Sequence, residues 1–291
     1  MANPSPVPYV SPGYIVARVA QLEPELRANV IGEGVYRRDH RLLSAAIAVF
    51  RAFFGEDWLI VRLRNPFIRP PIGAPIDEYK PVDRIVTLAE LLVNLQEVPG
   101  FEWCLSEVRT DSVESGLAKL AAAGMLRRRA IPFHFVVPRG QLGQDYDAEA
   151  LIGATRVAIE MKAKVEGREP SSSSVLETLR RARDQFPQDT PNVVFLRVPG
   201  AWGESSEGRQ AIVEGVEQQF RNSATIGMVV SHWERWAPIE PDGSVEKYTD
   251  RLLISINPRV RVRLTALYTA LLEGPPPGIF PWLSFGDLFP E

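Results

Sequence analysis

Two acidic residues and a lysine, spaced as they would be on neighbouring strands, are the side chains of this sequence best suited to chemistry. Asp147 is followed after twelve residues by Glu160-Met161-Lys162. Because alternate residues of a strand point to the same face, Glu160 and Lys162 would share one face, and Val157 and Ile159 would lie with Met161 on the other. The pattern therefore predicts a strand with an apolar core face and a polar face that carries an acid and a base.

The segment before this strand brings a second acid within reach. The dipeptide Gly153-Ala154 permits a tight turn, so its flanking segments are expected to form an antiparallel hairpin. Asp147 and Glu160 would then converge, and one or two carboxylates with phosphate oxygens are the usual protein ligands of Mg²⁺. Lys162 would orient a water molecule or stabilise charge on a phosphate. Asp145 shares the face of Asp147 and is an alternative acid, although Asp147 has the shorter reach to the turn.

The same three residue types also have an ordinary explanation. Solvent-facing strands commonly alternate Glu and Lys, and an Asp near a turn is common in loops. The Glu-x-Lys spacing by itself is therefore a weak indication of catalysis, and the elements around it must decide.

Helices and strands alternate around the two acids. Apolar residues at helical spacing predict a helix at 112–126 before the hairpin and another at 175–186 after it. Strands are expected at 131–137 and 192–198, the second of which is apolar almost throughout, as a buried strand is. The order is helix, three strands, helix, strand, which predicts an α/β fold with a mixed central sheet flanked by helices.

Between residues 106 and 200 the chain resembles the PD-(D/E)XK, or restriction-endonuclease-like, nuclease superfamily. The resemblance rests on this element order and on Asp147 followed by Glu160-Met161-Lys162, with no proline before the acid. It implies a restriction-endonuclease-like core, Mg²⁺ as cofactor with Mn²⁺ as a substitute, and DNA as the substrate. It also implies that Asp147 and Glu160 bind the metal ion and that Lys162 assists the attacking water.

The resemblance extends to residues on both predicted helices. Glu114 corresponds by element order to a glutamate that helps bind metal in many members, so a catalytic and metal-binding role is expected for it. Helix capping is an alternative, because Asp111 and Glu114 have capping-box spacing. Near the end of the second helix, Arg180, Arg183 and Gln185 are candidates for substrate binding, and some members carry such a glutamine. The helix dipole alone would also favour the arginines there.

Composition limits the classes of function that fit. The chain has 291 residues, a net charge of −3 and one cysteine, Cys104, which excludes a broadly basic surface, an intrachain disulfide and a cysteine zinc cluster. Nucleic acid would bind through local patches, such as Arg127–Arg129 or alternating arginines within 258–264 if that segment is extended. No apolar run is long enough to cross a membrane and no leader is evident, so a cytoplasmic protein that binds no membrane is expected.

The regions outside the predicted core carry fewer signals. A strand is predicted at 58–63 and a proline-rich link at 65–81. Aromatic residues near the end of the chain either pack back over the body or dock on another chain, so a homo-oligomer is compatible with the sequence. The chain is expected to divide into a mostly helical N-terminal region with proline-rich links, the nuclease-like domain, and a C-terminal helix with a proline- and aromatic-rich tail: 1–100, 101–260 and 261–291.

Two classes of function remain open. The first is a metal-dependent nuclease that hydrolyses phosphodiester bonds, with DNA expected as substrate by analogy of fold. The second is a catalytically inactive nuclease-like scaffold that acts in binding or assembly. The acidic net charge, the long flanking segments and the aromatic tail favour the second class, because none of them is needed for cleavage.

Overall fold

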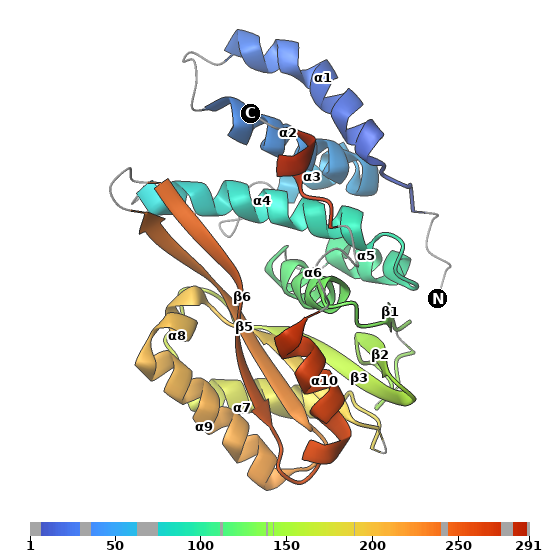
Figure 1. The fold of residues 1–291 in the computed structure, drawn as a ribbon, viewed down its shortest axis with the longest axis vertical. Coiled ribbons are helices and arrows are strands. Elements are labelled where there is room, and N and C mark those ends of the chain that lie inside the picture. The colour runs from blue at the N-terminus through green and yellow to red at the C-terminus, as the bar shows by residue number, and fades with distance from the viewer. Residues whose placement is uncertain are drawn as a thin grey trace.

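The fold is α/β, with a mixed sheet between helices and a block of further helices at one end (Figure 1). This arrangement confirms the predicted class, a mixed central sheet flanked by helices. The computed structural model describes residues 7–29, 36–62, 75–110, 113–137, 139–141, 143–188, 190–239, 244–274 and 282–289.

The sheet has six strands, which lie side by side in their sequence order. The first three form an antiparallel meander, the third, fourth and fifth run parallel, and the sixth returns antiparallel to the fifth. Both parallel connections pass through helices, as parallel neighbours require. The strands are β1 (Phe133–Phe135), β2 (Ala148–Ile152), β3 (Thr155–Ala163), β4 (Asn192–Arg197), β5 (Met228–Ile239) and β6 (Ser244–Ile256).

The helices form an N-terminal group, the covering layers of the sheet and a short C-terminal turn. Among the described helices, none is both long and apolar enough to cross a membrane. The helices are α1 (Pro12–Asn29), α2 (Tyr36–Phe54), α3 (Glu56–Arg62), α4 (Pro75–Leu95), α5 (Phe101–Thr110), α6 (Val113–Arg128), α7 (Ser172–Arg183), α8 (Gly200–Glu204), α9 (Ser206–Asn222), α10 (Arg261–Glu273) and α11 (Phe285–Leu288).

The two faces of the sheet pack against different helices. Val193 and Phe195 of β4 lie in the core shared with α6 and α10, whereas Val194 and Leu196 pack against α7 and α9. A strand buried on both faces must be apolar throughout, which is why β4 could be predicted from the sequence. Strand β3 differs from β4, because the face of β3 that is directed toward α7 carries the carboxylate of Glu160.

The N-terminal helices and the tail share one core with the sheet. Helix α4 packs against α6, and its residue Leu88 is buried in the same apolar cluster as Ile159 of β3. The backbone N–H of Phe285 donates to Oε1 of Glu90 at 2.7 Å, and the ring of Phe285 is fully buried. The described part of the tail therefore packs back on the body, where helix α11 contacts α2.

Two sequence predictions for the flanking segments are wrong, and one conditional expectation does not apply. The strand predicted at 58–63 is helix α3 as far as Arg62, where Trp58 stacks on Phe54 of α2. Short apolar runs do not distinguish a helix from a strand, and packing decides. Within the predicted proline-rich link, helix α4 already begins at Pro75, where a first-turn proline is tolerated, and 65–74 lies outside the described residues. Helix α10 begins at Arg261, so the alternating arginines do not lie on one extended segment.

Candidate functional site

Asp147 is held at the point where strand β3 continues beyond its neighbour. Strand β2 begins at Ala148, opposite Ile159, so the backbone N–H of Met161 lies past the last β2 pair. Oδ2 of Asp147 accepts that N–H at 2.7 Å. A side-chain carboxylate thus replaces the carbonyl that a longer strand would supply, because a buried N–H needs an acceptor. The predicted hairpin is formed, and this contact fixes Asp147 beside Glu160-Met161-Lys162.

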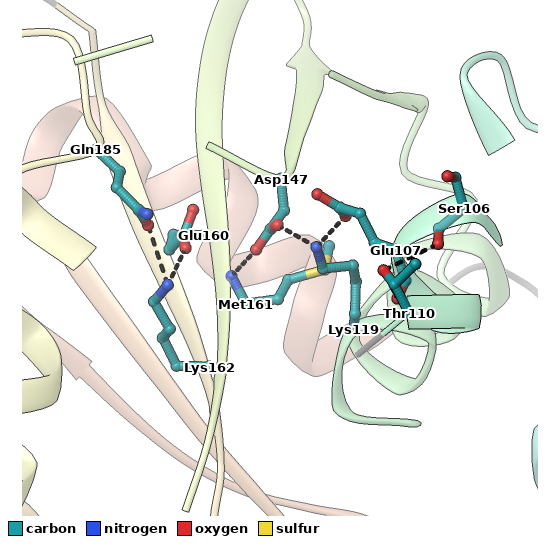
Figure 2. Close-up of polar contacts among 9 residues, drawn as sticks. All are labelled: Ser106, Glu107, Thr110, Lys119, Asp147, Glu160, Met161, Lys162 and Gln185. Carbon is teal, nitrogen blue, oxygen red and sulfur yellow. Dashed lines mark hydrogen bonds and ion pairs between the residues drawn. The ribbon is translucent and has the colours of Figure 1, made fainter. Parts of the chain in front are cut away.

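A lysine from helix α6 binds the other oxygen of Asp147. Nζ of Lys119 lies 2.6 Å from Oδ1 of Asp147 and also contacts Oε2 of Glu107 on α5 (Figure 2). Burial by itself would lower the pKa of Lys119, but the attraction of Asp147 and Glu107 outweighs it and raises the pKa above its ordinary value. Lys119 is therefore a fixed positive charge between two carboxylates.

Glu160 and Lys162 form a second acid-base pair on the α7 face of β3. Nζ of Lys162 lies 2.5 Å from Oε1 of Glu160 and donates to Oε1 of Gln185 at 3.0 Å (Figure 2). The side chain of Glu160 is only 2% exposed, and within the described chain its Oε2 atom has no hydrogen-bond partner. Burial, and next the carboxylate of Asp147, raise the pKa of Glu160 to about 8 against the opposing effect of Lys162. Glu160 thus holds a proton more readily than an exposed glutamate.

The Asp147–Lys119 pair and the Glu160–Lys162 pair border a single cavity of about 340 Å³. Each carboxylate is paired with a different lysine, Asp147 with Lys119 and Glu160 with Lys162. Among the described residues there is no set of three His, Cys, Asp or Glu arranged to hold a metal ion. Two carboxylates with waters or substrate oxygens are nevertheless a common way to bind Mg²⁺. The titratable and amide side chains that line the cavity are Glu107, Lys119, Asp145, Tyr146, Asp147, Glu160, Lys162 and Gln185.

Asp145, the alternative acid of the sequence prediction, has a different role in the structure. Its Oδ1 accepts the backbone N–H groups of Arg139 and Gly140 at 2.8 and 3.0 Å. It therefore closes the loop before β2, while Asp147 contacts both β3 and Lys119.

Glu114 does not lie with the predicted site residues. It is in the first turn of α6, and its Oε1 accepts the backbone N–H of Glu166 at 3.2 Å. Burial raises the pKa of Glu114, while that hydrogen bond and next Arg197 act in the opposite direction. Because a helix turns about 100° per residue, Glu114 projects about 140° away from Lys119 on the same helix. Glu114 is therefore not among the residues that line the cavity of Asp147 and Glu160, and its predicted metal-binding role stays a prediction.

The three predicted substrate-binding residues, in α7 and just after its end, lie in three different surroundings. Gln185 lines the site cavity and contacts Lys162. Arg183 pairs with Asp184 at 2.8 Å and borders a neighbouring cavity, whereas Arg180 is exposed and borders neither of the two. Of the three, only Gln185 reaches the acid-lysine cavity.

Sequence reasoning missed Lys119 and Glu107. Lys119 stands in the stretch Leu117-Ala118-Lys119-Leu120-Ala121, where one charge interrupts the buried part of a helix. A charge in such a place is rarely buried unless it is paired, so the stretch carried a usable signal. Glu107 had no comparable signal, because its helix is amphipathic and the contact depends on how α5 packs beside α6.

The surroundings of Glu160 are therefore those of a compact polar site at the end of a strand hairpin, built from α5, α6, β3, the loop before β2 and the end of α7. Comparison of the chain with protein-family models, with curated proteins and with solved structures found no match.

Proposed function

We propose that this protein is a metal-dependent nuclease with a PD-(D/E)XK-like core that hydrolyses phosphodiester bonds of DNA. The proposal rests on one observation, the contacts of the two carboxylate oxygens of Glu160. Its Oε1 lies 2.5 Å from Lys162, while its buried Oε2 has no hydrogen-bond partner within the described chain. An unpartnered buried carboxylate oxygen is costly, so a site built in this way is expected to receive a cation.

The order of elements supports the same proposal. Helix α6, strands β1, β2 and β3, helix α7 and strand β4 follow one another, with α6 and α7 on opposite faces of the sheet. Asp147 precedes the second of these strands, and Glu160 and Lys162 lie on the third. This order of elements agrees with the one predicted from the sequence, and the support that it gives to the proposal is associational.

The residues around the cavity fit a hard divalent cation. Asp147 and Glu160 would hold Mg²⁺, which accepts one or two protein carboxylates and completes its shell with water and phosphate oxygens. When bound, such an ion lowers the pKa of water and stabilises negative charge on a phosphate. Lys162 would donate to a phosphate oxygen or to the attacking water, and Gln185 would hold its ammonium in place. Lys119 would keep the Asp147 carboxylate aimed at the cavity.

A noncatalytic scaffold is the second candidate function. It is favoured by the pairing within the site, because Asp147 contacts Lys119 and Glu160 contacts Lys162 without any added cation. A site of this kind would bind or assemble with other molecules and would need no metal ion.

A cleavage assay separates the two candidates. Purified protein is incubated with labelled DNA and RNA, single-stranded and duplex, in Mg²⁺, Mn²⁺ or EDTA. We expect cleavage only with metal and its loss in Glu160→Gln and in Lys162→Met. The matched control is Glu177→Gln with Arg181→Met, an exposed acid-base pair on α7 that is outside the cavity. Metal-dependent cleavage that survives both site substitutions would show that another site, or a contaminant, cuts the substrate.

Thermal unfolding provides a test that needs no substrate. A ligand that binds the native state raises the melting temperature, so Mn²⁺ should stabilise the wild type and not Asp147→Asn. If Mn²⁺ shifts both proteins equally or neither, the metal site is not at Asp147 and the scaffold becomes the better explanation.

A further inference from the structure

A second cavity adjoins the proposed active site, and its lining holds three arginines against two acidic residues, Glu149 and Asp184. It measures about 760 Å³ and shares Val136 and Tyr146 with the acid-lysine cavity. Three arginines line it from separate elements: Arg139 from the loop between β1 and β2, Arg156 at the start of β3, and Arg183 at the end of α7. The arginines therefore come together only in the folded chain.

Two of these arginines have only long contacts with their present partners, whereas Nε and Nη2 of Arg183 donate to Oδ1 of Asp184 at 2.9 and 2.8 Å across an exposed pair. Nη1 of Arg139 donates to Gln144 at 3.2 Å, and Nη1 of Arg156 lies 3.5 Å from Oε1 of Glu149. The side chain of Arg156 is 72% exposed and that of Arg183 is 37% exposed. Ion pairs as exposed as these contribute little, and each guanidinium has five N–H donors, so a phosphate can be bound with little loss.

Tyr146 lies at the junction of the two cavities. It borders both of them, and its hydroxyl donates to Oε2 of Glu149 at 3.2 Å, which fixes the ring between the acid-lysine cavity and the arginines. An aromatic ring beside a positively charged groove is the common arrangement for binding single-stranded nucleic acid, since bases stack on the ring while phosphates contact the cations.

The size of the second cavity also favours a single strand. A volume of about 760 Å³ lies within the range of roughly 300–1,000 Å³ that encloses one small ligand. Duplex DNA is instead bound over about 1,000–2,500 Å² of protein surface, through grooves that admit a helix or a ribbon. Arg156 and Glu160 lie on the same face of β3, four residues and about 13 Å apart, so one strand of nucleic acid can reach both.

From these observations we propose that the arginine cavity binds a single-stranded segment of the DNA substrate beside the scissile phosphate. The protein consequently prefers single-stranded DNA to duplex DNA. The inference rests on the proposed nuclease function for the identity of the adjoining site, but binding in the arginine cavity is measured without cleavage.

The test is fluorescence anisotropy in EDTA, with labelled oligothymidylate and its duplex with oligoadenylate. We expect the single strand to bind at least about tenfold more tightly, because base stacking adds to the phosphate contacts. Replacing Arg139, Arg156 and Arg183 with Ala should make the slope of log affinity against log salt shallower by about 2, since each phosphate contact to a single strand contributes about 0.7. The control is Arg180→Ala with Arg181→Ala. Both residues lie on α7, the helix that carries Arg183, and outside both cavities.

Tyr146 is tested separately from the charges. Tyr146→Leu should weaken single-strand binding about tenfold, whereas Tyr146→Phe should bind as the wild type does, because stacking needs the ring and not the hydroxyl. Thermal melting of each variant verifies that the fold is retained.

The outcomes separate this inference from the nuclease proposal. Equal or tighter duplex binding, or an equal loss in the Arg180 and Arg181 control, overturns the inference even if metal-dependent cleavage is observed. Single-strand binding that depends on the three cavity arginines supports it, and it does so even if no metal supports cleavage, in which case the nuclease proposal fails alone.

Discussion

The burial of Glu160 predicts an unusual dependence of folding stability on pH. Its pKa rises from an ordinary 4.5 to about 8 in the folded protein, chiefly through burial. The folded state therefore binds this proton more tightly than the unfolded state does, so the contribution of Glu160 to stability falls as the pH rises from 4.5 to about 8. The slope in that range is about 1.4 kcal/mol per pH unit, and the whole range corresponds to at most about 5 kcal/mol.

Glu160→Gln removes this dependence because an amide does not ionise. Urea unfolding in EDTA is measured at several pH values between 4.5 and 8. The free energy of unfolding of the variant, relative to that of the wild type, should increase steadily as the pH rises over this range. Above that range the difference should become constant. Glu177→Gln, an exposed glutamate on α7, controls for the general loss of one negative charge.

Metal binding should follow the same titration. A bound cation needs the ionised carboxylate, so the apparent affinity for Mn²⁺ should rise up to about tenfold per pH unit below the pKa of Glu160 and level off above it. The reasoning would be refuted if the difference in free energy of unfolding between Glu160→Gln and the wild type did not change with pH. That result would mean that Glu160 is solvated or ionised throughout.

Three further predictions concern positions in the core. Lys119→Met leaves the carboxylates of Asp147 and Glu107 without their shared cation, and urea unfolding should show a loss of about 3–5 kcal/mol. Gly215→Ala would place a methyl group 2.7 Å from the backbone oxygen of residue 172, so α7 and α9 must separate at a cost of about 1–3 kcal/mol. Gly13→Ala would meet only the Ser11 hydroxyl at an ordinary contact distance of 3.9 Å and should be neutral or stabilising in the same assay. Burial raises the pKa of the Cys104 thiol, so iodoacetamide should label it only after unfolding, and rapid labelling of the native protein would contradict its buried position.

The strands of the core could be predicted because their signals are local. Apolar alternation in β3 and the continuous apolar run of β4 depend only on which faces are buried, and both appear in the sequence itself. The flanks were less predictable. The short segment from Glu56 to Arg62 is apolar in part, and only its packing on α2 makes it a helix.

The candidate site divides in the same way. Asp147, Glu160 and Lys162 could be grouped because a hairpin brings residues near in sequence together with fixed parity. Glu114 was grouped with them by element order, but a helix rotates each successive side chain, and its position along α6 directs it toward Glu166.

By itself the sequence determined the α/β class, the hairpin and the acid-lysine face of β3, since each follows from the two-residue period of a strand. Only the tertiary structure decided that Lys119 and Glu107 join Asp147, that Glu160 is buried with an elevated pKa, and that three arginines line an adjoining cavity. The physical reason is that burial and long-range contacts depend on how helices pack over the end of the hairpin, and no local pattern encodes that packing.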